Sequence, residues 1–135
     1  MKYFIALCIL VLVALGFMYV NYEQSTVDAP EIHRNLSVKE GDLISSPLVL
    51  TGEIVGIWFF EASFPVYVFD GLGNELGVGI AQGEGEWMTE NLVPFRAEIK
   101  FAQSLTDNGT LVLKKDNPSD LPEHDREIRI PIKLN

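Results

Sequence analysis

The chain has 135 residues, and its 10 Lys and Arg against 19 Asp and Glu give a net charge of −9 at pH 7. This acidic balance excludes a generic nucleic-acid binder, because a surface that follows phosphates needs clustered basic side chains. One cysteine excludes a disulfide framework and a cysteine-based zinc site, and two histidines leave little for histidine-based chemistry. We therefore expect no metal, no cofactor and no nucleic-acid partner.

The first twenty residues are far more apolar than the rest of the chain. Eighteen of them are hydrophobic, and no charge interrupts residues 3–20. As a helix, such a run is about 27 Å long, close to the hydrocarbon thickness of a bilayer. Tyrosines at its two ends suit a membrane interface. We predict a transmembrane signal anchor over residues 1–22, with residues 3–20 contacting the membrane.

The flanks of this segment bear on cleavage and orientation. The residues that follow the apolar core, MYVNY, contain no small-x-small cleavage site. The absence of a cleavage site favours an uncleaved anchor. The alternative is a cleaved signal, which would leave a secreted domain. Lys2 precedes the segment, whereas Glu23 and Asp28 follow it. The positive-inside preference predicts a single-pass protein of the cell membrane, with a cytoplasmic N-terminus and an extracytoplasmic C-terminal domain.

Residues 23–41 are polar without a clear period and are predicted to be a linker, and residues 42–135 to be the domain. Within the domain, residues 95–101 and 127–134 alternate apolar and polar side chains with the period of a half-buried strand. Pro131 has no N–H, so we expect either that the last strand lies at an edge or that Pro131 points its missing donor outward. Residues 48–55 and 64–69 are more apolar than these alternating runs, as expected for central strands.

Turn signals separate these runs, and no useful helical period follows residue 40. Residues 76–81 alternate large apolar side chains with glycine and alanine, and Leu111 and Leu113 continue the period of two. About six or seven short strands in some 95 residues predict an all-β domain, an antiparallel β-sandwich of about seven strands preceded by the one transmembrane helix. A small barrel is the alternative.

The densest aromatic stretch runs from Trp58 to Phe60, and three consecutive rings cannot all face one side of a strand. Either the segment is buried on both faces, or it bends, or one ring is exposed to a partner. Core packing, with Trp58 as a plug between sheets, is the favoured interpretation, and a ring exposed to a partner is the alternative. Glu61 follows, and a carboxylate among aromatic rings must be paired or reach solvent. We expect it to accept hydrogen bonds from turn backbone rather than to act as a general base.

Two acidic loops remain. The first, residues 83–90, combines carboxylates with Trp87 and Met88, and the second, residues 115–125, contains Asp116 and Asp120. Calcium is conceivable in both, but neither spacing is that of an EF-hand, and solvated loops are the simpler interpretation. No nucleophile elbow, zinc-binding helix motif or phosphate loop occurs in the sequence, so we predict no enzymatic activity.

Three segments together carry a family resemblance. They are residues 58–66 (WFFEASFPV), 85–95 (GEWMTENLVPF) and 111–123 (LVLKKDNPSDLPE), and the opening ISSP at residues 44–47 also fits. Residues 42–134 resemble the bacterial immunoglobulin-like domain found with spore-germination proteins, the second of the GerMN-associated domains, or Gmad type. The resemblance implies an immunoglobulin-like sandwich in an envelope or surface protein, and the family it points to has no established enzymatic activity or ligand.

The sequence thus predicts a membrane-anchored, extracytoplasmic binding module of the bacterial envelope, with a protein or glycan partner. The candidate contact residues are Trp58, Phe60, Glu61, Trp87 and Met88, since aromatic and methionine side chains are those that binding surfaces use. A structural or assembly subunit of an envelope or germination-related complex is the alternative.

Overall fold

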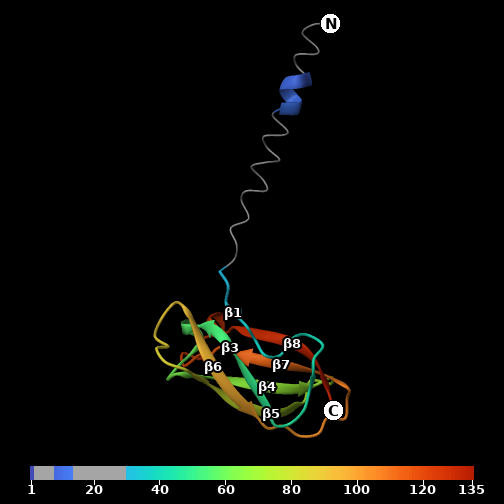
Figure 1. The fold of residues 1–135 in the computed structure, drawn as a ribbon, viewed down its shortest axis with the longest axis vertical. Coiled ribbons are helices and arrows are strands. Elements are labelled where there is room, and N and C mark those ends of the chain that lie inside the picture. Colours follow the sequence, from blue (N-terminus) through green and yellow to red (C-terminus); the bar gives the residue numbers. More distant parts are fainter. Residues whose placement is uncertain (2–7, 14–29) are drawn as a thin grey trace. The chain divides into compact units, whose positions relative to one another are not determined.

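The computed structural model describes residues 1, 8–13 and 30–135 (Figure 1). Residues 8–13 are helical, and in the described part of the chain no helix is long and apolar enough to cross a membrane. The rest of the predicted anchor and residues 23–29 of the predicted linker lie outside the described residues. The chain divides into two units, Met1–Glu31 and Ile32–Asn135, and the second is the folded domain.

Eight strands and two short 3-10 helices form this domain (Figure 1). In chain order they are β1 (His33–Arg34), β2 (Leu43–Ile44), β3 (Leu48–Val55), η1 (Gly56–Trp58), β4 (Ser63–Asp70), β5 (Glu75–Gly83), β6 (Leu92–Ile99), β7 (Asn108–Lys114), η2 (Pro122–His124) and β8 (Glu127–Leu134). The strands that the period of two predicted are confirmed to within a few residues, because alternating burial is what forms them.

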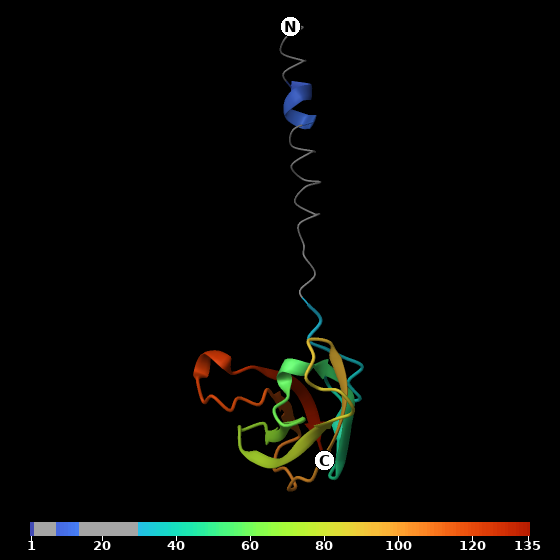
Figure 2. The same ribbon diagram turned by 90° about the vertical axis from the view of Figure 1, so that its left-hand side faces the viewer.

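The strands make one sheet in the order β1-β3-β6-β5-β4-β7-β8-β2. It curls so that the inner faces of its strands enclose one core, which Figure 2 shows from the side. The all-β, immunoglobulin-like class is as predicted, but the sheet is not split into two. The reason is that β5 pairs with both β4 and β6, and the short strands β1 and β2 raise the number to eight. All pairs are antiparallel except β2–β8.

Aromatic rings lie at the centre of the core. Phe64 is fully buried, and its ring meets Phe59 and Phe95 edge to face, with centroids 5.2 and 5.1 Å apart. Such edge-to-face pairs add about 0.5–1.5 kcal/mol beyond the area they bury. The core therefore extends without a break from η1 to the middle of β6.

Strand β5 turns its small residues inward. Gly79 and Ala81 are buried, whereas Val78 and Ile80 are about half exposed on the outer face. The reason is the close approach of β6, since a Cβ at Gly79 would lie 2.5 Å from the carbonyl oxygen of Glu98. A large side chain cannot fit there, so Val78 and Ile80 face outward.

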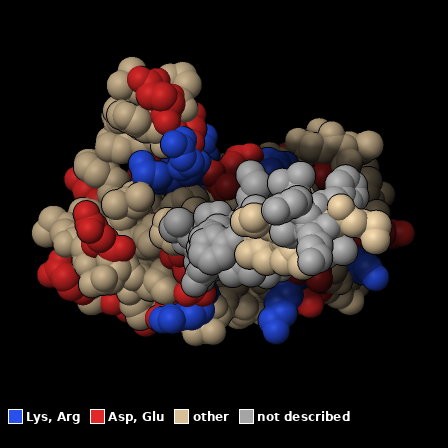
Figure 3. All heavy atoms as spheres, turned by 90° about the horizontal axis from the view of Figure 1, so that it is seen from above, with Lys and Arg blue, Asp and Glu red and all other residues tan. Residues whose placement is uncertain are grey.

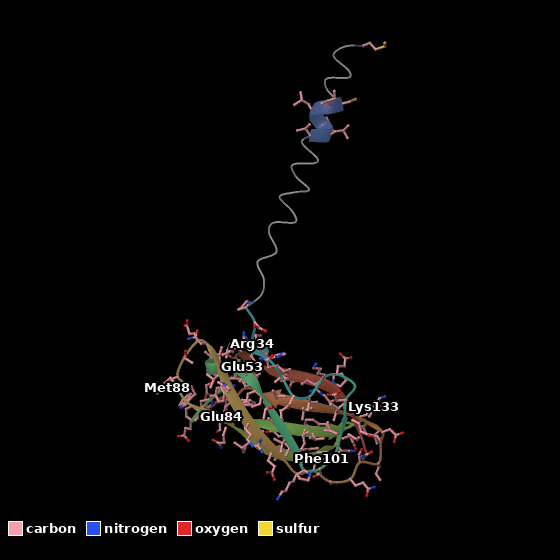
Figure 4. All side chains as sticks on the ribbon, viewed as in Figure 1. Arg34, Glu53, Glu84, Met88, Phe101 and Lys133 are labelled. Carbon is pink, nitrogen blue, oxygen red and sulfur yellow. The ribbon has the colours of Figure 1, made fainter. Side chains whose placement is uncertain are left out.

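Several residues of the predicted linker belong to the folded unit. Strand β1 pairs with β3, and Val38 is buried in the core. Arg34 Nε donates to a carboxylate oxygen of Glu53 at 3.2 Å, and Asn35 Nδ2 donates to the same oxygen at 2.9 Å (Figure 4). These hydrogen bonds lower the pKa of Glu53, with that from Arg34 as the largest cause. The segment just before β2 is thereby held along β3.

Candidate binding surface

The five candidate residues lie near one end of the domain, where β3 passes through η1 into β4 and where residues 84–91 connect β5 to β6. We call this the η1 end. Trp87 and Met88 line a shallow hollow together with Gly56, Ile57 and Phe59 of the η1 segment. The structure therefore brings together residues from two of the segments that the sequence singled out, some thirty positions apart.

Trp58 does not contribute a surface ring. Trp58 is 3% exposed and packs in the core, as the favoured core-packing interpretation predicted. Its backbone carbonyl accepts a hydrogen bond from Asp116 N at 3.1 Å. Its indole Nε1 is buried and has no hydrogen-bond partner in the described part of the molecule. Trp58 is thus a structural residue with one unsatisfied donor.

Phe60 and Glu61 belong to a two-residue turn. The backbones of Phe60 and Ser63 exchange hydrogen bonds of 3.0 and 3.1 Å, and Glu61 and Ala62 between them have φ of 50° and 63°. This is the geometry of a type I′ hairpin turn, which normally takes Asn-Gly. Phe60 is 43% exposed, so one ring of the aromatic run does reach the surface.

The expected hydrogen bonds of Glu61 are absent. Its side chain is exposed, and within residues 30–135 none of the hydrogen bonds or ion pairs reaches it. The prediction that it accepts from turn backbone is therefore wrong. The physical reason is that the turn closes through its own backbone, through Phe60, Ser63 and the Ala62 carbonyl, which accepts from Gly83 N at 2.7 Å.

The loop that presents Trp87 and Met88 is fixed by backbone contacts. Gly56 N donates to Asn91 O at 3.0 Å, and Met88 N donates to a carboxylate oxygen of Glu86 at 3.1 Å. A Cβ at Gly56 would overlap the carbonyl oxygens of Trp87 and Thr89, so only glycine lets the loop lie against η1. The surface is held in place by these contacts.

The hollow has a volume of about 330 Å³ and is mostly apolar. Met88 is 74% exposed and Ile57 63%, and Trp87 lies half-buried between loop and core. Figure 4 shows Met88 projecting outward at this end of the domain. The exposed carboxylates Glu84, Glu86 and Glu90 belong to the same loop. The surface is thus an apolar area in an acidic setting.

Sequence reasoning missed Ile57. An isoleucine next to two aromatic residues is expected to be buried in the core, and its neighbour Trp58 is indeed buried. The signal that was available is Gly56, because a glycine at the end of a strand marks a bend or a close backbone approach. Such a bend turns the following side chain away from the sheet.

Neither acidic loop gathers the ligands of a metal ion. Across the described residues, no three side chains of His, Cys, Asp or Glu converge on one point. In the second loop the polar groups satisfy one another instead. Asn117 Nδ2 donates to an oxygen of Asp125 and to the Leu121 carbonyl, both at 2.9 Å. This loop is thus held by its own hydrogen bonds.

Residues 38–121 match the family model Gmad2, the immunoglobulin-like domain of bacterial spore germination. The chain belongs to this family. The resemblance carried by residues 58–66, 85–95 and 111–123 is thus confirmed, apart from the last two positions of the third segment. Strand β8 lies beyond the matched range and completes the core of this Gmad2 domain. No curated protein and no solved structure matches the chain.

Proposed function

We propose that this Gmad2 domain is a non-catalytic binding module, anchored in the bacterial membrane by residues 3–20 and displayed outside it. The observation that carries the proposal is the η1 end, where exposed Met88 and Ile57 flank a half-buried tryptophan. Large apolar side chains clustered at a fixed surface position support a contact role, because exposing them to water is unfavourable until a partner covers them.

The surroundings of this surface indicate the kind of partner. Glu84, Glu86 and Glu90 lie in the loop that carries Met88, and residues 32–135 as a whole contain nine Lys and Arg against sixteen Asp and Glu. A partner protein with an apolar anchor and a basic rim complements such a surface, because rim charges steer association while the buried centre supplies affinity. Anionic lipid headgroups do not complement it.

Crosslinking at Met88 tests this proposal. In cells that produce the full chain, a photo-crosslinking residue at position 88 should give a discrete adduct. The same residue at Leu105, which is 97% exposed and outside the η1 end, should give none. The substitution Ile57→Glu should abolish the adduct while the protein level is kept. Equal crosslinking at positions 88 and 105 would refute the assignment of this surface.

Anchoring has its own test. Residues 1–20 contain the apolar run. If they form an uncleaved anchor, deleting them should move the domain from the membrane fraction to the soluble fraction. An unchanged membrane fraction would show that something else holds the domain there. A chain that already lacks these residues when isolated would show cleavage.

A structural or assembly role is the second candidate, and one observation favours it. Val78 and Ile80 are exposed on the outer face of β5, where they neighbour Tyr67 and Pro65 of β4. An apolar sheet face of this kind suits contact with a second copy or a neighbouring envelope protein. Light scattering on the full chain and on the variant Val78→Asp tests for self-assembly through this face. If the face mediates assembly, the full chain should have an oligomeric mass, and that mass should fall in the variant.

A further inference from the structure

A second apolar cavity lies on the other side of Ile57, between the start of β8 and the chain that enters β1. Its volume is about 330 Å³. Its apolar walls come from both sides of the opening, namely from Ile32, Val55, Ile57, Trp58 and Ile128. The cavity is therefore the place where the two ends of the curled sheet fail to meet and the core is reached from outside.

The edge of β8 beside this cavity is unpaired. Leu134 N donates inward to Asp107 O, whereas Lys133 N donates outward to Asp42 O, so alternate residues of β8 point their backbone groups outward. Strand β2 covers only Lys133 and Leu134, and Gly41 N donates to Pro131 O. By the same alternation the N–H and C=O of Arg129 point outward, and no described residue bonds to them.

Hydrogen-bond donors gather around the opening. Nε1 of Trp58, which lines the cavity, is buried without a partner. Lys115 Nζ contacts only the Asp116 carbonyl, at 3.5 Å, and Arg126 donates only to the carbonyls of Glu123 and Asp125. Neither cation has an ion pair among the described residues. Figure 3 shows basic atoms at the base of the lobe that the η2 segment forms.

The carboxylates at the cavity do not cancel these cations. Glu127 is already paired with Arg129, at 3.0 Å. Among the residues that line the opening, Glu123 is then the one remaining carboxylate, and it faces the two cations Lys115 and Arg126. His124 also lines the opening, and its Nδ1 lies 3.0 Å from Ser119 Oγ. The opening thus has a surplus of donors in a domain that is acidic overall, and it complements a ligand that brings acceptors.

We propose that this cavity binds an extended peptide segment of a partner protein, which adds as a strand to the free edge of β8. One aliphatic side chain of the peptide enters the cavity, and a carboxylate two residues away, on the same face of the added strand, meets Lys115 and Arg126. Strand addition explains why an apolar cavity and an unpaired edge occur together, because alternate side chains of an added strand point into the core. This inference deepens the proposed binding function and names a second surface with its ligand class.

Synthetic peptides test the inference on the full chain in detergent micelles. The probes are blocked hexapeptides that alternate Thr with Val, Ile or Leu and end in Asp, and the matched controls end in Lys. Trp87→Phe leaves Trp58 as the one tryptophan, so its fluorescence reports the cavity, while amide NMR shifts report the edge. We expect the Asp peptides to bind about tenfold more tightly than the Lys peptides.

Two substitutions at one position separate the edge from the side chain. Arg129→Pro removes the outward N–H, whereas Arg129→Ala keeps it. Because both release Glu127 from its ion pair, the Pro variant should bind about tenfold more weakly than the Ala variant. Lys115→Ser and Arg126→Ser change a half-buried and an exposed side chain outside the hydrophobic core, so they should keep the fold and erase the preference for Asp. They keep the inference testable if Arg129→Pro does not fold.

The inference is overturned if no peptide of the set shifts the Trp58 signal or the amides of β8 below about 2 mM. It is also overturned if Arg129→Pro, once folded, binds like Arg129→Ala, or if the shifts map to other elements. A failure here leaves crosslinking at Met88 unaffected, and failed crosslinking leaves the peptide titration unaffected. The two surfaces are therefore tested independently.

Discussion

The two ends of β4 differ in how the chain closes the domain around its core. At its C-terminal end, Asp70 is nearly buried and accepts hydrogen bonds from Leu72 N, Asn74 N and Asn74 Nδ2 at 2.8–2.9 Å. Gly71 N donates to Thr106 Oγ1 at 2.8 Å. At the other end lie the strained turn at Glu61 and Ala62, the shallow hollow and the cavity. One end is closed by its own polar groups, and the other leaves apolar surface open.

This difference indicates where the domain has room for a partner. A turn whose donors and acceptors satisfy one another offers little to a ligand, because each new bond replaces an existing one. The η1 end instead keeps exposed Met88 and Ile57 and an unsatisfied Trp58 donor. We infer that the polar end serves stability and the η1 end serves contact, and the following predictions test that contrast.

The largest effect is expected in the core beneath the η1 end. Phe64→Ala should lower the free energy of unfolding by about 3–5 kcal/mol, because it removes a fully buried ring with two edge-to-face partners. Phe60→Ala, four residues earlier, removes a ring that is 43% exposed and should cost less than about 1 kcal/mol. Urea unfolding of both variants measures the difference, and equal losses would contradict the burial assigned to the two rings.

Gly56→Ala should break the contact surface itself. The added methyl group overlaps the backbone of Trp87 and Thr89, so the loop must move, at a cost of about 1–3 kcal/mol. NMR shifts should concentrate in residues 86–91. Glu90→Ala in the same exposed loop is the control and should stay within about 0.5 kcal/mol of the parent. Unchanged loop shifts in Gly56→Ala would show that the loop does not rest on η1.

Asp70 should make the closed end sensitive to acid. Hydrogen bonds from the Asn74 side chain and from backbone N–H groups lower its pKa. A lowered folded pKa stabilises the fold above the unfolded pKa, and this contribution is lost as pH falls through the folded value. Asp70→Asn should therefore melt below the parent at pH 7, and the gap should narrow in acid. A gap that is independent of pH would contradict this linkage.

The smallest effect, and one of opposite sign, is expected at the turn. Glu61→Asn with Ala62→Gly should stabilise the domain by about 1 kcal/mol, because left-handed backbone disfavours ordinary L-residues. Ala81→Gly is the matched control and should destabilise, since Ala81 is buried in a regular strand. Thermal melts compare the two. A destabilised turn variant would show that Glu61 and Ala62 make contacts worth more than the strain.

Much of the fold could be predicted because its signal is local. The period of two in residues 127–134 and the largely apolar composition of residues 48–55 depend only on which side chains leave water, and both strands are found. The outcome for β5 required the neighbouring strand. Whether Val78 or Gly79 faces the core depends on how closely β6 approaches β5. That distance cannot be predicted from residues 75–83 alone.

The candidate site shows the same division. The sequence by itself determined an all-β Gmad2 domain and the segments that carry the site, because composition and alternation are properties of each segment alone. Only the tertiary structure decided that Trp58 is buried, that Ile57 and Met88 share one hollow, and that β8 has an open edge beside a cavity. These facts depend on which segments, distant in the sequence, come into contact. Packing across the curled sheet determines those contacts.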